Sequence, residues 1–225
     1  MKAICEKLPK TLLVIGPSGS GKDTQVDKLV ERCGCVKITT GEMFRDSYEK
    51  KTAKGIQAYE VWSQGEWVAD DLTYEMLSDY VTQFDREKPW ILVAVVRRPT
   101  QVPMLDALLE KQGRSLGGVL YFPLSEEAAI ERMSLRRICP KCKADYHLKY
   151  KKPKNGEVCD NDGEQLTVRD DDRPDAIANR LRSYNETIRP ILEEYRKRGI
   201  LIEVDAAPPI EEVWKSVQKA FDLSE

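Results

Sequence analysis

The chain has 225 residues, of which 41% are hydrophobic and 33% charged, so it holds enough apolar material for one sizeable core. A formal net charge of −2 argues against a nucleic-acid-binding protein, whose surface would gather an excess of Lys and Arg. No apolar run approaches the length of a membrane span and the N-terminal segment interleaves charges with a short apolar run, so we expect a cytoplasmic protein without a signal peptide.

Short apolar runs and helical stripes alternate along the chain. The apolar runs predict five strands, at 10–16, 35–38, 90–96, 117–122 and 199–205. Apolar residues at helical spacing predict helices at 26–33, 72–84, 105–109, 125–136, 177–195 and 210–221, and a broken helix at 41–65 that Gly55 and Gly65 interrupt. This alternation implies an α/β fold with a parallel sheet and helices on both faces, which binds ligands at the carboxyl ends of its strands.

A glycine-rich loop follows the first expected strand, in the stretch "LLVIGPSGSGKDTQ". The spacing Gly16-x4-Gly21-Lys22 lets backbone N–H groups converge on an anion at the positive end of the next helix. Lys22 would then reach the outer phosphates of a nucleotide. A glycine-rich turn with a solvated lysine is the alternative, but the strand before and the helix after favour a phosphate-binding loop.

Asp23 stands where a serine or threonine usually follows the lysine of such a loop, and Thr24 comes next. A carboxylate beside bound phosphates repels them unless a cation intervenes. Asp23 is therefore expected either to point outward, as a residue of the first helical turn, or to help hold Mg²⁺.

The six cysteines form two groups. Cys5, Cys33 and Cys35 lie in an apolar part of the chain, where we expect buried thiols, because disulfides are rare in cytosolic proteins. The other three lie in a polar insert, 137–173, which lacks a long apolar stripe. We therefore expect this insert to be held together by something other than a core.

The cysteines of the insert have the spacing of a structural metal site. Cys139-x2-Cys142 and Cys159-x2-Asp162 supply three thiolates and one carboxylate, a closed set of ligands for Zn²⁺. His147, the single histidine, is the alternative fourth ligand, although a lone histidine in such a stretch is more often a strand residue. Iron could replace zinc at a sulfur-rich tetrahedral site, and reduced cysteines without metal are the remaining alternative.

Several segments resemble the adenylate kinases and related nucleoside monophosphate kinases. "GPSGSGKDTQ" is similar to their phosphate loop, "ITTGEMFRD" to the segment that grips the monophosphate, and "QGEWVADDLT" to a further family motif. The stretch that begins "RRICPKCKADYHLKY" and ends "IRPILEEYRKRG" looks like the long zinc-bearing lid and following helix of bacterial adenylate kinases. The resemblance covers essentially the whole chain.

The resemblance implies a P-loop three-layer fold with a central five-stranded parallel sheet and two mobile inserts, adenylate kinase being a standard example of such closure over substrates. The core would comprise 1–38, 69–134 and 174–225. A helical monophosphate-binding insert would occupy 39–68, and a small β lid with the zinc site would occupy 135–173.

The resemblance also assigns site residues position by position. ATP is expected to contact Gly16, Ser18, Gly19, Ser20, Gly21, Lys22, Asp23, Thr24, Arg132 and Arg136. AMP is expected to contact Thr40, Arg45, Val68, Arg97, Gln101, Arg169 and Arg180, with Thr40 and Gln101 at the adenine. The expected catalytic set is Lys22, Arg97, Arg136, Arg169 and Arg180, because phosphoryl transfer needs in-line positioning and neutralised phosphate oxygens. A surface ion pair is the alternative for any one of these arginines.

The chain departs from the family pattern after the third expected strand, where "VAVVR" replaces "DGFPR". Val93 removes an aspartate that helps hold hydrated Mg²⁺, Ala94 replaces the glycine and Val96 the proline. We hypothesise that Asp23 supplies the missing carboxylate in the outer shell of the metal. An outward-facing Asp23 and a weakened enzyme are the competing interpretations. Leu135 replaces a hinge glycine and could stiffen the lid, because it lacks the φ range of glycine.

These features predict a member of this family that catalyses ATP + AMP ⇌ 2 ADP with Mg²⁺ and carries a structural Zn²⁺ in its lid. The resemblance implies a monomer without nucleic-acid or membrane partners. A kinase for CMP, UMP or GMP is one alternative, although Thr40 and Gln101 favour AMP. A catalytically impaired nucleotide-binding protein, prompted by Val93, is the other.

Overall fold

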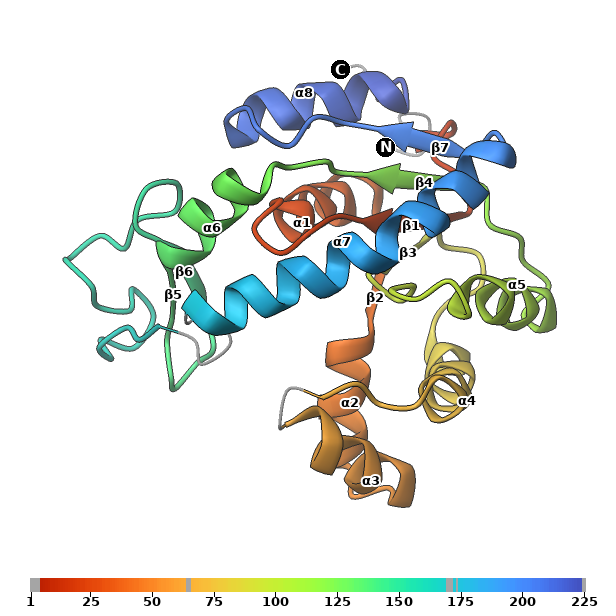
Figure 1. The fold of residues 1–225 in the computed structure, drawn as a ribbon, viewed down its shortest axis with the longest axis horizontal. Coiled ribbons are helices and arrows are strands. Elements are labelled where there is room, and N and C mark those ends of the chain that lie inside the picture. The colour runs from red at the N-terminus through yellow and green to blue at the C-terminus, as the bar shows by residue number, and fades with distance from the viewer. Residues whose placement is uncertain (1–4, 64–65, 169–171, 173, 224–225) are drawn as a thin grey trace.

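The computed structural model describes residues 5–63, 66–168, 172 and 174–223, with the backbone alone at 174–176 and 180. Five strands form one parallel sheet in the order β2-β3-β1-β4-β7 (Figure 1). They are β1 (Thr11–Ile15), β2 (Val36–Thr39), β3 (Trp90–Val93), β4 (Gly118–Tyr121) and β7 (Leu201–Glu203). The predicted α/β fold with a five-stranded parallel sheet is confirmed.

Eight α-helices connect and cover these strands in the described part of the chain. They are α1 (Lys22–Cys33), α2 (Thr40–Glu49), α3 (Ala53–Trp62), α4 (Asp70–Tyr80), α5 (Gln101–Lys111), α6 (Glu126–Ser134), α7 (Pro174–Lys197) and α8 (Ile210–Ala220). A 3₁₀ turn, Val81–Gln83, extends α4. Within the described ranges, none of the helices combines the length and the apolar character that a membrane crossing requires.

The expected broken helix at 41–65 is a pair of helices, but Gly55 does not cause the break. Gly55 lies in the first turn of α3, where its backbone N–H donates to the capping hydroxyl of Thr52 at 3.0 Å. The chain turns instead between Glu49 and Ala53, where Lys51 adopts a φ of 54°. Gly65, the other expected break, lies outside the described residues.

Alternate residues of the central strands β1, β3 and β4 face two separate cores. Leu13 and Ile15 of β1 belong to a core that α4, α5 and the second half of α7 cover. Leu12 and Val14 belong to a second core, covered by α1 and α8 on the opposite face. This two-sided burial explains why the strands appear in the sequence as nearly continuous apolar runs.

β3 ends earlier than its apolar run predicts. The run at 90–96 is apolar throughout, but the strand stops at Val93 because Ala94 adopts a left-handed φ of 51°. Val95 and Val96 remain buried in the core without belonging to the sheet. The turn at Ala94 therefore directs the following residues along the edge of the sheet where β1 also ends.

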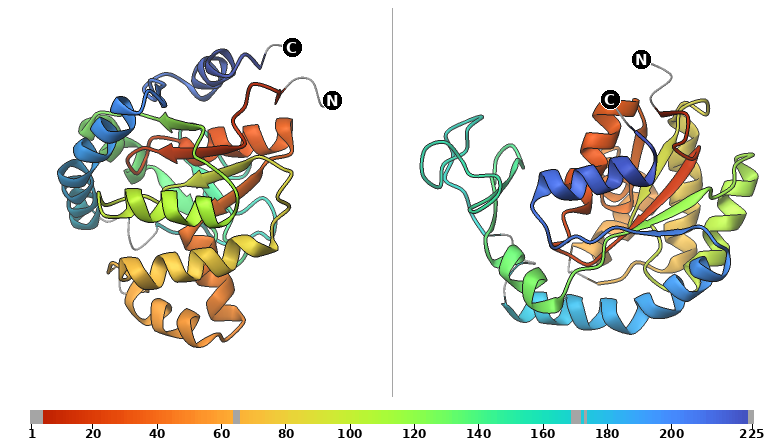
Figure 2. Two further views of the ribbon diagram at one scale, coloured as in Figure 1. Left: turned by 90° about the vertical axis from the view of Figure 1, so that its right-hand side faces the viewer. Right: turned by 90° about the horizontal axis from the view of Figure 1, so that it is seen from above.

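Two segments extend from this body (Figures 1 and 2). The pair α2 and α3 projects beyond the end of β2, and α2 and α3 pack on each other and on α4. The second segment holds a two-stranded antiparallel sheet of β5 (Arg136–Ile138) and β6 (Asp145–His147). Among its described residues, the buried apolar cluster consists of Cys139, Tyr146, Cys159 and Leu166, which is too small to be a sizeable core.

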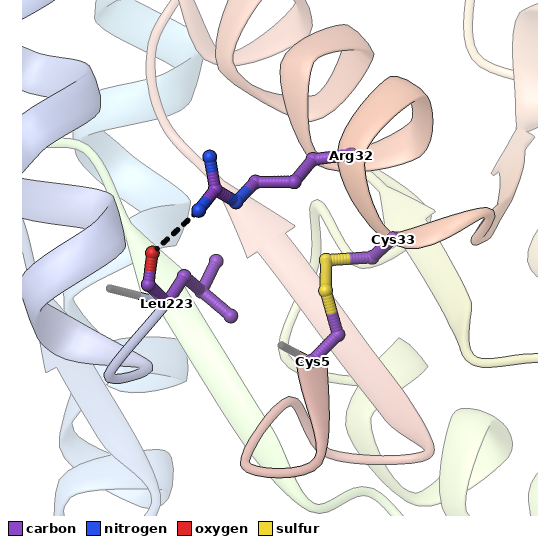
Figure 3. Close-up of a disulfide and its surroundings, with 4 residues drawn as sticks. All are labelled: Cys5, Arg32, Cys33 and Leu223. Atoms are coloured by element: carbon purple, nitrogen blue, oxygen red, sulfur yellow. Dashed lines mark hydrogen bonds between the residues drawn. A yellow bond between two sulfur atoms is a disulfide. The ribbon is translucent and has the colours of Figure 1, made fainter. Parts of the chain in front are cut away.

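A disulfide joins Cys5 to Cys33, which corrects the expectation of buried thiols at these positions (Figure 3). The N-terminal turn lies over the end of α1 and brings the two Cα atoms to 5.8 Å. At the same end of α1, Arg32 donates to the carbonyl of Leu223 at 3.0 Å. Cys35 is a free, buried thiol as expected, and burial raises its pKa to about 11.

Candidate functional site

The glycine loop joins β1 to α1 and requires glycine at two positions for different reasons. A Cβ on Gly16 would lie 2.7 Å from Ser20 Oγ and 3.0 Å from the carbonyl oxygen of Phe122, so no side chain fits. Gly21 caps α1 with a left-handed φ of 78°, which glycine adopts without strain. The loop thereby presents the positive end of α1 at the carboxyl edge of the sheet.

Lys22 and Asp23 begin α1 beside this loop. Lys22 Nζ donates to the carbonyl of Pro17 at 3.3 Å, so the lysine lies back across its own loop. Lys37 Nζ of β2 lies 3.3 Å from Asp23, whose side chain is 58% exposed. Desolvation raises the pKa of Asp23, but the charges of Lys22, Lys37 and Arg136 outweigh it, and the pKa lies below its ordinary value.

Two arginines lie near the junction of α6 and the β5–β6 segment. Arg132, at the end of α6, donates to the carbonyls of Gly19 at 3.4 Å and Ala207 at 2.9 Å. Arg136 begins β5 and donates to both carboxylate oxygens of Asp172, at 2.6 Å and 2.5 Å. Asp172 is 3% exposed, so this bidentate ion pair is largely shielded from water.

The residues expected at the monophosphate lie on α2. Thr40 is the first residue of this helix and is 9% exposed, while Thr39 accepts the capping hydrogen bond from the N–H of Glu42 at 3.0 Å. The Arg45 guanidinium lies 5.7 Å from the centre of the Trp62 ring, a cation–π contact between α2 and α3. The α2–α3 pair thus places the Arg45 guanidinium and the buried Thr40 hydroxyl beside the end of β2.

The segment between β3 and α5 carries Arg97 and Gln101. Gln101 is buried, and its Oε1 accepts the backbone N–H groups of Arg97 at 2.6 Å and Arg98 at 3.1 Å. Its Nε2 donates to Asp70 at 2.6 Å, and the Arg98 guanidinium also donates to Asp70. Arg98 further donates to the carbonyl of Val68 at 3.1 Å, which places Val68 against this segment.

The four expected metal ligands come together in the β5–β6 segment. Ligand atoms of Cys139, Cys142, Cys159 and Asp162 all lie within 4.8 Å of one another. The sulfurs of Cys142 and Cys159 are 3.5 Å apart, close to the ~3.8 Å that a tetrahedral site with Zn–S bonds of about 2.3 Å requires. The backbone N–H of Glu164 holds the pKa of Asp162 at about 2, so a carboxylate faces the thiols.

His147 lies outside this group of ligand atoms. Its Nδ1 accepts backbone N–H groups from Lys149 at 3.1 Å and Tyr150 at 3.3 Å. Burial lowers its pKa, and the charges of Arg132, Lys149 and Arg136 act in the same direction. His147 is the last residue of β6, as expected for a lone histidine in this stretch, and its imidazole closes the turn that follows.

The positions that depart from the family pattern have structural explanations. Val93 packs in the second core, and Val96 packs in the first. Ala94 occupies a left-handed conformation that glycine would adopt without strain. Leu135 ends α6 with a φ of −93°, which any residue adopts, so its backbone does not require glycine.

Sequence analysis missed several residues at this edge of the sheet. Asp70 and Arg98 form an ion pair there, and Asp172 pairs with Arg136 at the start of β5. The Trp67 ring, 51% exposed, lies 5.6 Å from the guanidinium groups of both Arg97 and Arg98. The adjacent arginines and the Trp in a family motif were the available signals. Arg169 lies outside the described residues, and Arg180 lies in α7 with its side chain outside them.

A parallel sheet with a phosphate-binding loop after its central strand, and with arginines on the neighbouring segments, defines a P-loop phosphotransferase of the nucleoside monophosphate kinase class. The family model of adenylate kinase matches residues 14–200. The chain belongs to the adenylate kinase family.

Adenylate kinases from several organisms are similar in sequence to nearly the whole chain. The adenylate kinase of Archaeoglobus fulgidus is 36% identical over 211 residues, which are 94% of this chain and 97% of that protein. The adenylate kinase of Carboxydothermus hydrogenoformans is 37% identical over 93% of this chain and 98% of its own length. That of Thermococcus kodakarensis is 36% identical over 94% of this chain and 93% of its own length.

Proposed function

We propose that the chain transfers a phosphoryl group from ATP to AMP, reversibly, and yields two molecules of ADP. The observation that carries this proposal is the position of two segments at one edge of the sheet. β1 and β3 pair in parallel, with Val14 opposite Val93, so the glycine loop and the segment that carries Arg97 leave the same edge side by side. Their cations can therefore act on adjoining phosphates.

The glycine loop is proposed to bind the phosphates of ATP. Gly16 to Thr24 would surround them, and Ser18, Gly19 and Ser20 provide backbone groups between the two required glycines. Ser20 supports this role, because its hydroxyl is buried without a partner among the described residues. Lys22 would exchange the Pro17 carbonyl for phosphate oxygens, and Arg132 would lie near the base.

The acceptor AMP would lie between α2 and the segment after β3. Thr40 and Gln101 would contact the adenine, Val68 would line the site, and Arg45 and Arg97 would bind the phosphate. Arg136, with Arg169 and Arg180, would neutralise the transferred group. Positioned cations contribute most in such a reaction, because charge spreads over the phosphate oxygens in the transition state.

Mg²⁺ would bind together with ATP and would supply positive charge that neutralises the phosphate oxygens. Asp23 is the candidate carboxylate for its outer shell, because Val93 is apolar and buried where the family has an aspartate. The present ion pair of Asp23 with Lys37 is compatible with either role of Asp23. Activity of Asp23→Ala at limiting Mg²⁺ tests this assignment, since unchanged activity would exclude it.

The cysteine cluster, Cys139, Cys142, Cys159 and Asp162, is proposed to hold one structural Zn²⁺. The separation of its ligand atoms fits the ion, and backbone N–H groups of Cys142 and Asn161 already donate to the sulfurs of Cys139 and Cys159 at 3.4 Å each. The metal would stabilise a lid at 135–173, while 39–68 would form the monophosphate-binding insert and the remainder the core.

A coupled assay that offers AMP, CMP, UMP and GMP in turn tests the proposed function. We expect AMP to be the preferred acceptor, because Thr40 and Gln101 match the adenine-directed members of the family. Preference for another monophosphate would reassign the acceptor. Nucleotide binding without transfer to any of the four would indicate an impaired enzyme, which Val93 brings into consideration.

A further inference from the structure

The carboxylate of Asp70 accepts hydrogen bonds from three side chains of one short segment, which lie just before α5 or at its first residue. It accepts hydrogen bonds from the Arg98 guanidinium, from Thr100 Oγ1 at 2.7 Å and from Gln101 Nε2 at 2.6 Å. Asp70 begins α4, and its side chain is 18% exposed, so these bonds are partly shielded from water and correspondingly strong. The carboxylate therefore fixes the position of this segment relative to α4.

The amide of Gln101 transmits this restraint to Arg97. Its Oε1 accepts the backbone N–H groups of Arg97 and Arg98, while its Nε2 faces Asp70. A backbone N–H only donates and a carboxylate only accepts, so one orientation of the amide satisfies both sides. Because Gln101 is 4% exposed, the reversed amide would leave buried donors and acceptors unpaired at a cost of several hydrogen bonds.

The side chain of Arg97 is restrained at the same place. Its Nε donates to the carbonyl of Ala94 at 3.0 Å, and its guanidinium lies 5.6 Å from the Trp67 ring. Trp67 lies in the short connection between α3 and α4, and Asp70 is the first residue of α4. The start of α4 and the residues before it thus act on Arg97 twice, through the aromatic ring and through the chain of bonds from Asp70 to Gln101.

We propose that Asp70 is a positioning residue that acts through Gln101 to place Arg97 for binding the acceptor phosphate. The inference rests on the proposed function, in which Arg97 contacts that phosphate. Asp70 itself contacts neither substrate. Ribose 5-phosphate is a suitable probe, because it carries the phosphate of AMP without the base that Gln101 would contact.

Asp70→Asn tests the proposal, since it keeps the shape of the side chain and removes its charge. We expect the KM for AMP and the inhibition constant of ribose 5-phosphate to rise together by roughly tenfold, as expected for a weakened charge-assisted hydrogen bond. The KM for ATP should stay within about twofold, because ATP binds at the glycine loop. A general structural defect would raise both KM values.

Thr100→Val is the matched control. It removes a donor to Oδ2 of the same carboxylate, whereas Gln101 donates to Oδ1, so the bond from Asp70 to Gln101 stays intact and both KM values should stay within about twofold of the unsubstituted chain. The double variant Asp70→Asn/Gln101→Leu should bind ribose 5-phosphate no worse than the weaker-binding single variant, because both changes break one chain of bonds.

Four results would overturn the inference: additive losses in the double variant, equal losses for both substrates, a loss in Thr100→Val as large as that in Asp70→Asn, or no inhibition of the unsubstituted chain by ribose 5-phosphate. If Asp70→Asn does not fold, the binding of ribose 5-phosphate to Gln101→Leu is measured instead. Because this probe has no base, a loss of its binding reports on the placement of Arg97 and not on a lost contact between Gln101 and the base. Failure of the unsubstituted chain to phosphorylate any monophosphate would overturn the proposed function instead.

Discussion

Reduction of the Cys5–Cys33 disulfide should lower the free energy of unfolding substantially. The bond joins residues 28 apart in the sequence and restrains the unfolded chain by closing this loop. The chain-entropy relation for a loop of that length gives about 3.6 kcal/mol at 25 °C. For a chain of this length, such a loss corresponds to a decrease in Tm of roughly 7–14 °C.

The assay is urea and thermal unfolding with and without a dithiol reductant. Cys5→Ser should show the lower stability of the reduced protein, and the reductant should have no further effect on it through this bond. Cys35→Ser is the control, because Cys35 is a free thiol in the same core. Whatever its own stability, this variant should keep the full reductant-dependent decrease.

The result that would refute this reasoning is a decrease of less than about 1 kcal/mol on reduction, well below the loop-closure value. It would mean that other contacts hold the N-terminal turn in place. The nearest candidates are Leu8, which is buried in the second core, and the ion pair of Lys7 with Asp222. A reductant effect that persists in Cys5→Ser would likewise assign the decrease to another part of the chain.

Three further predictions concern other parts of the molecule. Ala94→Gly should raise the free energy of unfolding in urea by about 0.5–1 kcal/mol, because relief of about 1–2 kcal/mol of left-handed strain exceeds the added entropy of the unfolded chain; a decrease would contradict it. Removal of zinc by a chelator should lower the Tm. If free zinc is present at 1,000 times its Kd before removal, the loss in free energy of unfolding should be roughly 4 kcal/mol. The Cys142→Ser variant should no longer respond to the chelator, and purified protein without zinc would contradict the prediction. Lys37→Met should raise the pKa of Asp23, measured by carboxyl NMR titration, because burial already favours the protonated form and one opposing cation is lost. The pKa of Asp23 is lower in the folded than in the unfolded chain, so its ionised carboxylate stabilises the fold above the unfolded pKa. This stabilisation disappears as the pH falls through the folded pKa. The Lys37→Met variant, with a higher folded pKa, should therefore lose this stabilisation at a higher pH.

The elements that the sequence predicts well are those whose signal lies within one segment. The central strands β1, β3 and β4 are covered on both faces, so each one is an apolar run that can be recognised without knowledge of its neighbours. The glycine loop is equally local, because its spacing and its flanking elements are contiguous. The grouping of the candidate metal ligands could be predicted for the same reason, because each pair lies in one short stretch of sequence.

The features that sequence analysis missed depend on contacts between distant segments. Apolar residues at Val95 and Val96 extend the run of β3, and periodicity does not separate burial in a strand from burial in a turn. Asp70 at a helix start is accounted for by the helix dipole alone, although its partner Arg98 lies 28 residues further along the chain. Only the fold brings such pairs together.

The ion pair of Arg136 with Asp172 joins the two ends of the β5–β6 segment, because Arg136 lies near its start and Asp172 near its end. Neither large core takes a described residue from between them. The side chains of the segment also contact α6, where Lys149 pairs with Glu131 and the Arg132 guanidinium lies over the Tyr150 ring. We therefore expect that the segment, together with these partners on α6, can be exchanged between relatives without rebuilding the sheet that carries it.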